Sequence, residues 1–92
     1  MAHYAFLDEN NIVTEVIAGI DETELIEGLD TETWYGNFRN QKCVRTSING
    51  RIRFRPAGVG YSYDETRDAF IPPKLSENAV FDEDSLQWVE IG

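Results

Sequence analysis

The sequence is poor in the residues from which disulfide scaffolds and histidine-based sites are built. It contains one cysteine, Cys43, and one histidine, His3. A single thiol cannot form an intrachain disulfide, so a stapled secreted scaffold is excluded and a reducing compartment is favoured during folding. A single imidazole rules out a metal site with several histidines. Because His3 lies beside the N-terminus, we interpret it as an exposed terminal side chain and expect no histidine-based triad.

Long hydrophobic runs are also missing. The longest apolar runs are four or five residues, whereas a membrane-spanning helix needs about 20. Residues 1–11 have neither a basic start nor a long apolar stretch, so we expect no signal peptide and no membrane association. The glycines at 58 and 60 are too close together for a phosphate loop and lack its Lys-Ser/Thr ending.

No residue pattern typical of catalysis is present. Cys43 would need a neighbouring base to act as a nucleophile, and His3 is the only imidazole in the chain. A cysteine on a strand is more often a small buried hydrophobic residue. The many carboxylates cluster at turns, where a solvated surface is the simpler interpretation. We therefore expect a protein that is not an enzyme, with no catalytic residues, no metal and no cofactor.

The length of 92 residues fits a single domain spanning residues 1–92. Two Trp, four Tyr and five Phe supply much of a thin core, which suggests that a partner subunit helps to complete it. The pattern predicts a mainly β fold of consecutive antiparallel hairpins, forming a small sheet or an open barrel with one short helix. Runs rich in β-branched and aromatic residues, separated by Asp/Asn turns, predict strands at 3–7, 12–18, 43–48, 51–55, 61–63, 69–71, 79–81 and 87–91.

The second hairpin is predicted around Asn49-Gly50, because Asn-Gly between strand-like runs is a strong hairpin signal. A turn one residue longer than the minimum would pair Ile48 with Ile52 and Thr46 with Phe54. One face of this hairpin would then be apolar and the other basic, so we prefer that register. The members of the apolar face would be Val44, Ile48, Ile52 and Phe54, and those of the basic face Arg45, Arg53 and Arg55.

Two helix-start signals lie between the first two hairpins. Asp21 and Glu24 form a capping-box pattern, which predicts a turn or two of helix that ends near Gly28. Asp30 begins a second start signal, and the rings at 34, 35 and 38 then fall on one side of a helix. We therefore expect helix at about 31–39, weakened by Gly36.

A short internal repeat links three turns, each with a large apolar residue followed by Asp and Glu. These turns lie at 7–9, 63–65 and 81–83, and residues 63–71 align without gaps on residues 81–89. Acidic loops of this kind could hold Ca²⁺, but the EF-hand spacing is absent. Turn chemistry alone explains the residue types, because Asp readily opens a type I turn. We favour that second interpretation.

The charge is strongly segregated. Six of the eight basic residues lie between Arg39 and Arg55, and no Asp or Glu occurs from Thr33 to Tyr63. This basic segment carries +6, while the other two bases and the seventeen acids give the rest of the chain −15, for a net charge of −9. Its candidate binding residues are Lys42, Arg45, Arg51, Arg53 and Arg55.

Three interpretations of the basic segment remain open. Alternating arginines on one strand could contact nucleic-acid phosphates, although the net acidity disfavours this. They could also bind carboxylates of a second subunit or another protein, because Arg pairs with carboxylates in a bidentate manner. The simplest interpretation is that the acidic remainder of the same domain neutralises them.

Three stretches of the sequence resemble a known group of viral proteins. The first is the opening Met-Ala-His-aromatic-Ala with a following Asp-x-Asn-Asn-x-Val turn, at residues 1–5 and 8–13. The second is a Thr-Ser-x-Asn-Gly-x-x-Arg stretch at 46–53, and the third is the run from 57 to 74. Trp88 matches a Trp near the C-terminus. Together these stretches resemble small proteins of unknown function from T4-like phages of marine cyanobacteria and related marine metagenome sequences.

The resemblance covers most of the chain, is dense over residues 42–74, and departs at 19–41, where this sequence has an acidic, aromatic insert. The Pro-rich tail of many members is also absent. The resemblance implies a phage-encoded virion or assembly protein that associates with itself or with another phage protein. It further implies a location in the host cytoplasm during infection, with the virion as the alternative. No catalytic residue carries over, because the group supplies none.

Overall fold

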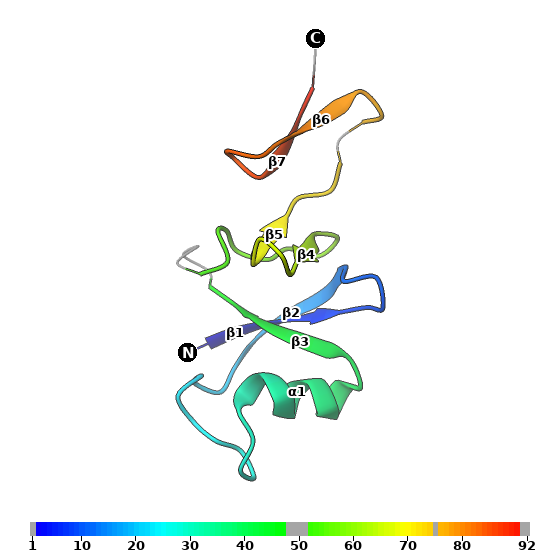
Figure 1. Ribbon diagram of the computed structural model, residues 1–92. Helices are drawn as coiled ribbons and strands as arrows, with labels where there is room; N and C mark the ends of the chain where they lie inside the picture. Colours follow the sequence, from blue (N-terminus) through cyan, green and yellow to red (C-terminus); the bar gives the residue numbers. More distant parts are fainter. Residues whose placement is uncertain (1, 48–51, 75, 91–92) are drawn as a thin grey trace.

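In the computed structural model, which describes residues 2–47, 52–74 and 76–90, the first strand lies at the centre of the main sheet (Figure 1). The strands are β1 (Ala2–Leu7), β2 (Val13–Gly19) and β3 (Lys42–Thr46), in the antiparallel order β2-β1-β3. Ala5 of β1 pairs with Val16 on one side and with Val44 on the other. The first hairpin predicted from the sequence is confirmed.

The turn between β1 and β2 is closed by Asp8. Its Oδ1 accepts hydrogen bonds from the backbone N–H groups of Asn10 at 2.8 Å and Ile12 at 3.0 Å. Asn11 adopts a left-handed conformation with φ of 61°, which Asn tolerates better than most residues. The Asp-x-Asn-Asn sequence therefore forms the turn through its own side-chain chemistry.

One face of the sheet is covered by α1 (Thr31–Arg39), as the second start signal predicts. Asp30 is the N-cap, and its Oδ1 accepts a hydrogen bond from Thr33 N–H at 2.7 Å. Asn40 ends the helix in a left-handed conformation with φ of 54°. Tyr35 anchors the helix to the sheet, with its ring centroid 4.7 Å from that of Tyr4, whose side chain is fully buried.

The helix expected between Asp21 and Gly28 is wrong. Asp21 instead accepts hydrogen bonds from the N–H and the hydroxyl of Thr23, at 2.9 and 2.7 Å, which closes a local turn. Further on, Ile26 and Leu29 exchange backbone hydrogen bonds around Glu27 and Gly28, whose φ angles are 53° and 82°. Two successive left-handed residues are incompatible with a right-handed helix.

The strand expected at 51–55 is also wrong for the described residues 52–55, which form a bend. Arg53 and Phe54 have φ angles of 51° and 72°, so the chain cannot continue as a strand there. Thr46 pairs with His3 of β1 rather than with Phe54, whose side chain is 52% exposed. The expected Asn-Gly turn, and the pairing of Ile48 with Ile52, involve residues 48–51, outside the described residues.

The other face of the sheet is covered by the hairpin of β4 (Ser62–Asp64) and β5 (Ala69–Ile71). Phe70 of β5 is fully buried and forms a cluster with Ala5, Leu7, Val13 and Val44. Backbone hydrogen bonds link this layer to the sheet, because Val13 N–H donates to the carbonyl of Tyr61 at 2.7 Å. One part of the core therefore lies between the sheet and Phe70, and the other lies on the α1 face, where Tyr4 and Phe6 are fully buried against Tyr35.

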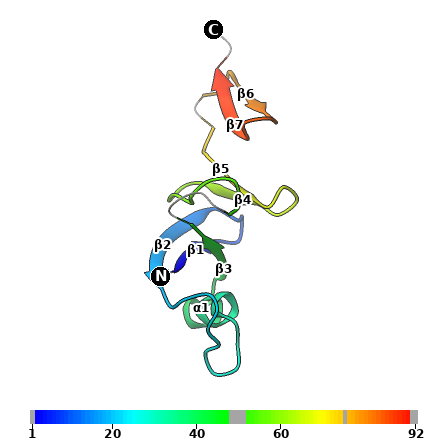
Figure 2. The same cartoon turned by 90° about the vertical axis from the view of Figure 1, so that its left-hand side faces the viewer.

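A last hairpin, of β6 (Ala79–Asp82) and β7 (Gln87–Glu90), follows the prolines that end β5. Figures 1 and 2 show four successive layers along the long axis: α1, the sheet, the β4–β5 hairpin and the β6–β7 hairpin. The molecule measures 52 Å along its longest axis and 25 by 21 Å across. The mainly β fold of antiparallel hairpins with one helix is confirmed, and the sheets do not close into a barrel.

The internal repeat corresponds to a repeated hairpin geometry. Tyr63 pairs across the strands with Phe70, and the aligned Phe81 pairs with Trp88. Each aromatic pair has its ring centroids 5.3 Å apart. The last turn residues, Asp68 and Leu86, also align, and both have a φ of 50°. The two hairpins are thus the same structural unit used twice.

Candidate functional site

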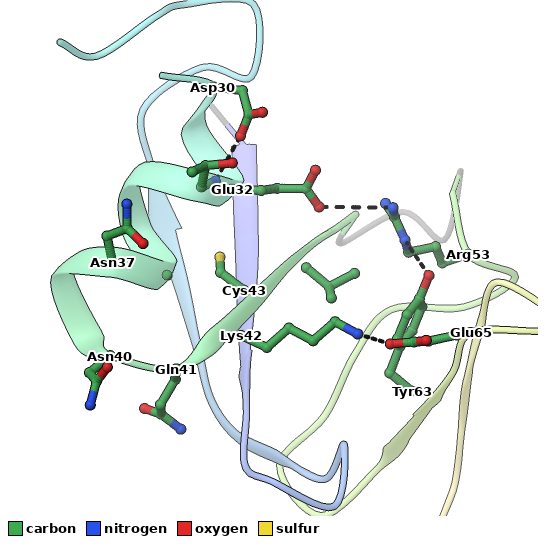
Figure 3. A pocket seen from close by; sticks show the side chains of 13 residues that line it. Asp30, Glu32, Asn37, Asn40, Gln41, Lys42, Cys43, Arg53, Tyr63 and Glu65 are labelled. Carbon is green, nitrogen blue, oxygen red and sulfur yellow. Dashed lines mark hydrogen bonds and ion pairs between the residues drawn. The ribbon is translucent and has the colours of Figure 1, made fainter. Parts of the chain in front are cut away.

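An open groove of about 830 Å³ runs beside the basic segment (Figure 3). Helix α1 supplies one wall, the first half of β3 the floor, and the β4–β5 hairpin the opposite wall. Two of the five candidate binding residues, Lys42 and Arg53, line it. The groove is therefore the place to ask whether the basic side chains are available to a ligand.

Lys42 is engaged by the β4–β5 hairpin. Its Nζ forms an ion pair with Glu65 Oε1 and lies 5.9 Å from the centroid of the Tyr63 ring. One cation thus holds both the carboxylate and the ring of the hairpin that packs on the sheet. Within the described residues, the ammonium group connects two layers of the fold.

Arg53 is the most heavily engaged base in the groove. Its Nε lies 3.1 Å from Asp68 Oδ1 and 3.5 Å from the Tyr63 hydroxyl, and its Nη2 lies 3.8 Å from Glu32 Oε2. Its Nη1 also donates to the carbonyl of Arg45 at 3.0 Å. Burial lowers the pKa of Arg53, but the hydrogen bond to Tyr63 and the two carboxylates more than offset this, so the pKa is raised. The guanidinium is permanently charged and already surrounded by acceptors.

Arg55 is used in a different way, because it binds carbonyl oxygens rather than carboxylates. Its guanidinium donates to the carbonyls of Phe70 at 2.9 Å and of Ser85 and Leu86 at 2.5 Å each. It therefore connects β5 with the turn of the β6–β7 hairpin.

Of the described candidate bases, Arg45 does not line the groove. Arg45 lies half-buried on β3, and Arg51 falls outside the described residues. Arg39, at the end of α1, pairs with Glu15 and stacks 4.7 Å from the centroid of the Phe6 ring. The structure thus brings together Lys42 and Arg53, while Arg55 reaches toward the last hairpin.

A basic residue that lies outside the basic segment repeats the role of Lys42. Arg67 Nη2 lies 2.6 Å from Glu83 Oε2, and its guanidinium carbon lies 5.1 Å from the centroid of the Phe81 ring. In the repeat alignment, Glu83 corresponds to Glu65 and Phe81 to Tyr63. Each hairpin is therefore held by one cation of the preceding layer, which binds both an aromatic ring and the turn glutamate; we call this arrangement the layer clamp.

The layer clamp could have been found in the sequence from the gapless alignment of 63–71 on 81–89. That alignment places an aromatic residue and a Glu at equivalent positions. It does not show which base binds them, because Lys42 and Arg67 occupy unrelated positions in the chain. The sequence therefore identifies the aromatic residue and the Glu of each hairpin, but not that Lys42 and Arg67 bind them.

Cys43 is poorly suited to nucleophilic chemistry. It pairs with Phe6 of β1, is half-buried, and its pKa is raised to about 12 by burial and by the charge of Glu32. A nucleophilic thiol needs the opposite shift. The expectation that His3 is exposed is wrong, because His3 is half-buried on β1. It pairs with Thr46, which lies three residues after Cys43 on β3.

Over residues 2–47, 52–74 and 76–90, no three His, Cys, Asp or Glu side chains are grouped so as to hold a metal ion. The repeat turns instead use Asp64 and Asp82 as acceptors for backbone N–H groups of Arg67 and Asp84. No helix in these same ranges combines the length and apolar character needed to cross a membrane.

Comparison with known proteins adds no relative. No family model, no curated protein and no solved structure matches the chain.

Proposed function

We propose that the protein is a structural or assembly protein of a tailed phage that works by protein–protein contact and has no enzymatic activity. The observation that carries this proposal is the contrast between its charged and apolar groups. Lys42, Arg53 and Arg67 are bound to carboxylates of the same chain. The apolar side chains of Val80 and Val89, in contrast, are half exposed on the outermost hairpin.

The internal ion pairs weigh against the alternative of a module that binds nucleic acid or a host protein through residues 39–55. A phosphate-binding surface needs guanidinium and ammonium groups that are free to contact an anion. Here, contact with phosphate would require breaking pairs that hold the layers together. A gel-shift series with nucleic acid and the wild type, Arg53→Ala and Arg55→Ala tests this directly. We expect no salt-sensitive binding of nucleic acid by any of the three proteins.

The resemblance to cyanophage proteins supports a role in the particle or in its assembly within the host cytoplasm. The decisive measurement is mass spectrometry of purified phage particles and of assembly intermediates from the same infection. We expect peptides of this chain in one or both, at an abundance comparable to known structural proteins. Absence from both, with the protein abundant in the infected lysate, would refute the structural role.

A further inference from the structure

The last hairpin presents two different faces. Phe81 and Trp88 lie on the face that the preceding layers hold, through Arg67 over Phe81 and through Lys74, 5.3 Å from the Trp88 centroid. Val80 and Val89 pair across the strands on the other face, where their side chains are 50% and 45% exposed. A two-stranded hairpin is marginally stable in water without a partner on its apolar side chains. The Val80–Val89 face therefore lacks a covering layer among the described residues.

The repeat shows what this face lacks. Val89 aligns with Ile71, which is only 6% exposed in the β4–β5 hairpin. The β4–β5 hairpin holds the β6–β7 hairpin through Arg67. In the last hairpin the residue that aligns with Arg67 is Ser85. Within 76–90, the described residues include five acids and no Lys or Arg. The last hairpin thus offers an apolar pair flanked by carboxylates but no cation, so a covering surface must supply the positive charge.

A surface with the complementary character lies on the bend at 52–55. The ring of Phe54 is 52% exposed, and the guanidinium of Arg55 stacks on it, 4.8 Å from the ring centroid. The chain carries no acid from Thr33 to Tyr63. An aromatic ring with a cation beside it is the combination that the layer clamp already uses within the molecule.

We propose that the Val80–Val89 face of one copy binds the Phe54 bend of a second copy. Phe54 would cover the two valines, while the positive charge of Arg55, which stacks on that ring and among the described residues binds only carbonyl oxygens of its own chain, would lie beside the carboxylates of the hairpin. Contact between two Val80–Val89 faces alone is disfavoured, because Asp82 lies on the same face of the hairpin as Val80, and this carboxylate of both copies would come to the contact without a cation. This inference rests on the proposed function in protein contact and identifies the partner as the chain itself.

Sedimentation of the full chain tests the proposal. The wild type is expected to associate between micromolar and millimolar concentration. The double variant Val80→Ser/Val89→Ser and the single variant Phe54→Ser should each weaken association by at least about tenfold, the effect of losing a buried apolar anchor. Leu25→Ser and Phe38→Ser, at residues that are each 71% exposed elsewhere, are matched controls expected to associate like the wild type.

A mixing experiment makes the test specific. Each of the two defective variants retains one half of the contact, so an equimolar mixture should form a 1:1 complex although neither variant associates alone. Far-UV circular dichroism verifies that the variants are folded. If the double serine variant does not fold, Val89→Thr, which keeps the shape and adds a hydroxyl, replaces it.

Three results would overturn the inference: a wild type that stays monomeric, a Phe54→Ser variant that associates normally, or a mixture that does not associate. None of them bears on whether the protein is part of the particle, which mass spectrometry decides separately. If the protein is monomeric in solution but present in purified particles, the proposed function remains supported. The partner of the Val80–Val89 face would then be a different protein.

Discussion

Glu32 and Arg53 meet at the outer edge of β3, where each binds the backbone of Arg45 and their charged groups lie 3.8 Å apart. Glu32 Oε2 accepts a hydrogen bond from Arg45 N–H at 2.7 Å, and Arg53 donates to the Arg45 carbonyl at 3.0 Å. The two side chains thus occupy the hydrogen-bonding positions that a further strand would use. An edge strand covered in this way is protected from pairing with other chains.

Loss of the Glu32 carboxylate should therefore destabilise the fold. We expect Glu32→Ala to lower the free energy of unfolding by about 1 kcal/mol, because Arg45 N–H loses its acceptor. Glu32→Gln keeps an acceptor oxygen and should cost less. Urea denaturation measures both, and equal losses for Ala and Gln would show that the charge rather than the hydrogen bond matters.

The layer clamp leads to a prediction about local opening. Arg67→Ala should loosen the β6–β7 hairpin, because the base that binds both Glu83 and Phe81 is lost while Arg55 and Lys74 still contact it. Amide hydrogen exchange is expected to accelerate several-fold in β6 and β7 and to stay unchanged in β1. Lys42→Ala provides the matched comparison, since it should loosen the β4–β5 layer instead. Uniform acceleration across all strands in Arg67→Ala would contradict the independent docking of the hairpin.

Gly36 should resist a substitution that usually stabilises helices. In an exposed helix interior, Gly→Ala typically gains roughly 1 kcal/mol. A Cβ at Gly36, however, would lie 2.8 Å from the carbonyl oxygen of Gln41, which is backbone and cannot turn away. We expect Gly36→Ala to lower the midpoint of urea denaturation, whereas Asn37→Ala, on the exposed side of α1, should raise it slightly. A stabilised Gly36→Ala protein would show that the chain after α1 adapts easily.

The raised pKa of Cys43 predicts a loss of stability at alkaline pH. Burial favours the neutral thiol, so its contribution is complete below the ordinary value of 9.0 and is lost as the pH rises toward about 12. The stability of the wild type should fall more steeply over this range than that of Cys43→Ala. Parallel curves for the two proteins would contradict a buried neutral thiol.

The same property can be measured without unfolding the protein. Iodoacetamide reacts with the thiolate, so Cys43 of the native chain should react far more slowly at neutral pH than the same residue in guanidinium chloride. Equal rates would mean that the thiol is as acidic and as accessible in the fold as in the unfolded chain.

Elements whose signals are local could be predicted from the sequence. The Asp8 turn, the α1 cap at Asp30 and the two repeat hairpins each depend on side chains that bond to backbone a few residues away. Asp21 carries a similar signal but closes a turn instead, because the left-handed Glu27 and Gly28 follow it. A capping residue thus marks where a helix of this kind begins, but it does not by itself make the following residues helical.

The candidate site could be predicted only in part, because its contacts join distant segments. The sequence shows which bases make up the basic segment. The expectation that acids of the same domain neutralise them does not identify which acid binds which base. That Glu65 binds Lys42, or that Asp68 binds Arg53, depends on how the β4–β5 hairpin packs on the sheet. The incorrect prediction of a strand at 52–55 has the same origin. β3 was expected to pair with the next segment of the chain, but it pairs with β1 instead.

The central position of β1 has a consequence for synthesis on the ribosome. β1 is made before the other strands of the sheet, and β2 can pair with it as soon as both have emerged. The opposite edge of β1 must wait for β3, which is complete only at Thr46, halfway along the 92 residues. During that interval the outward edge of β1 in the nascent hairpin is unpaired, so the speed at which α1 and β3 are translated sets how long this edge is exposed to mispairing.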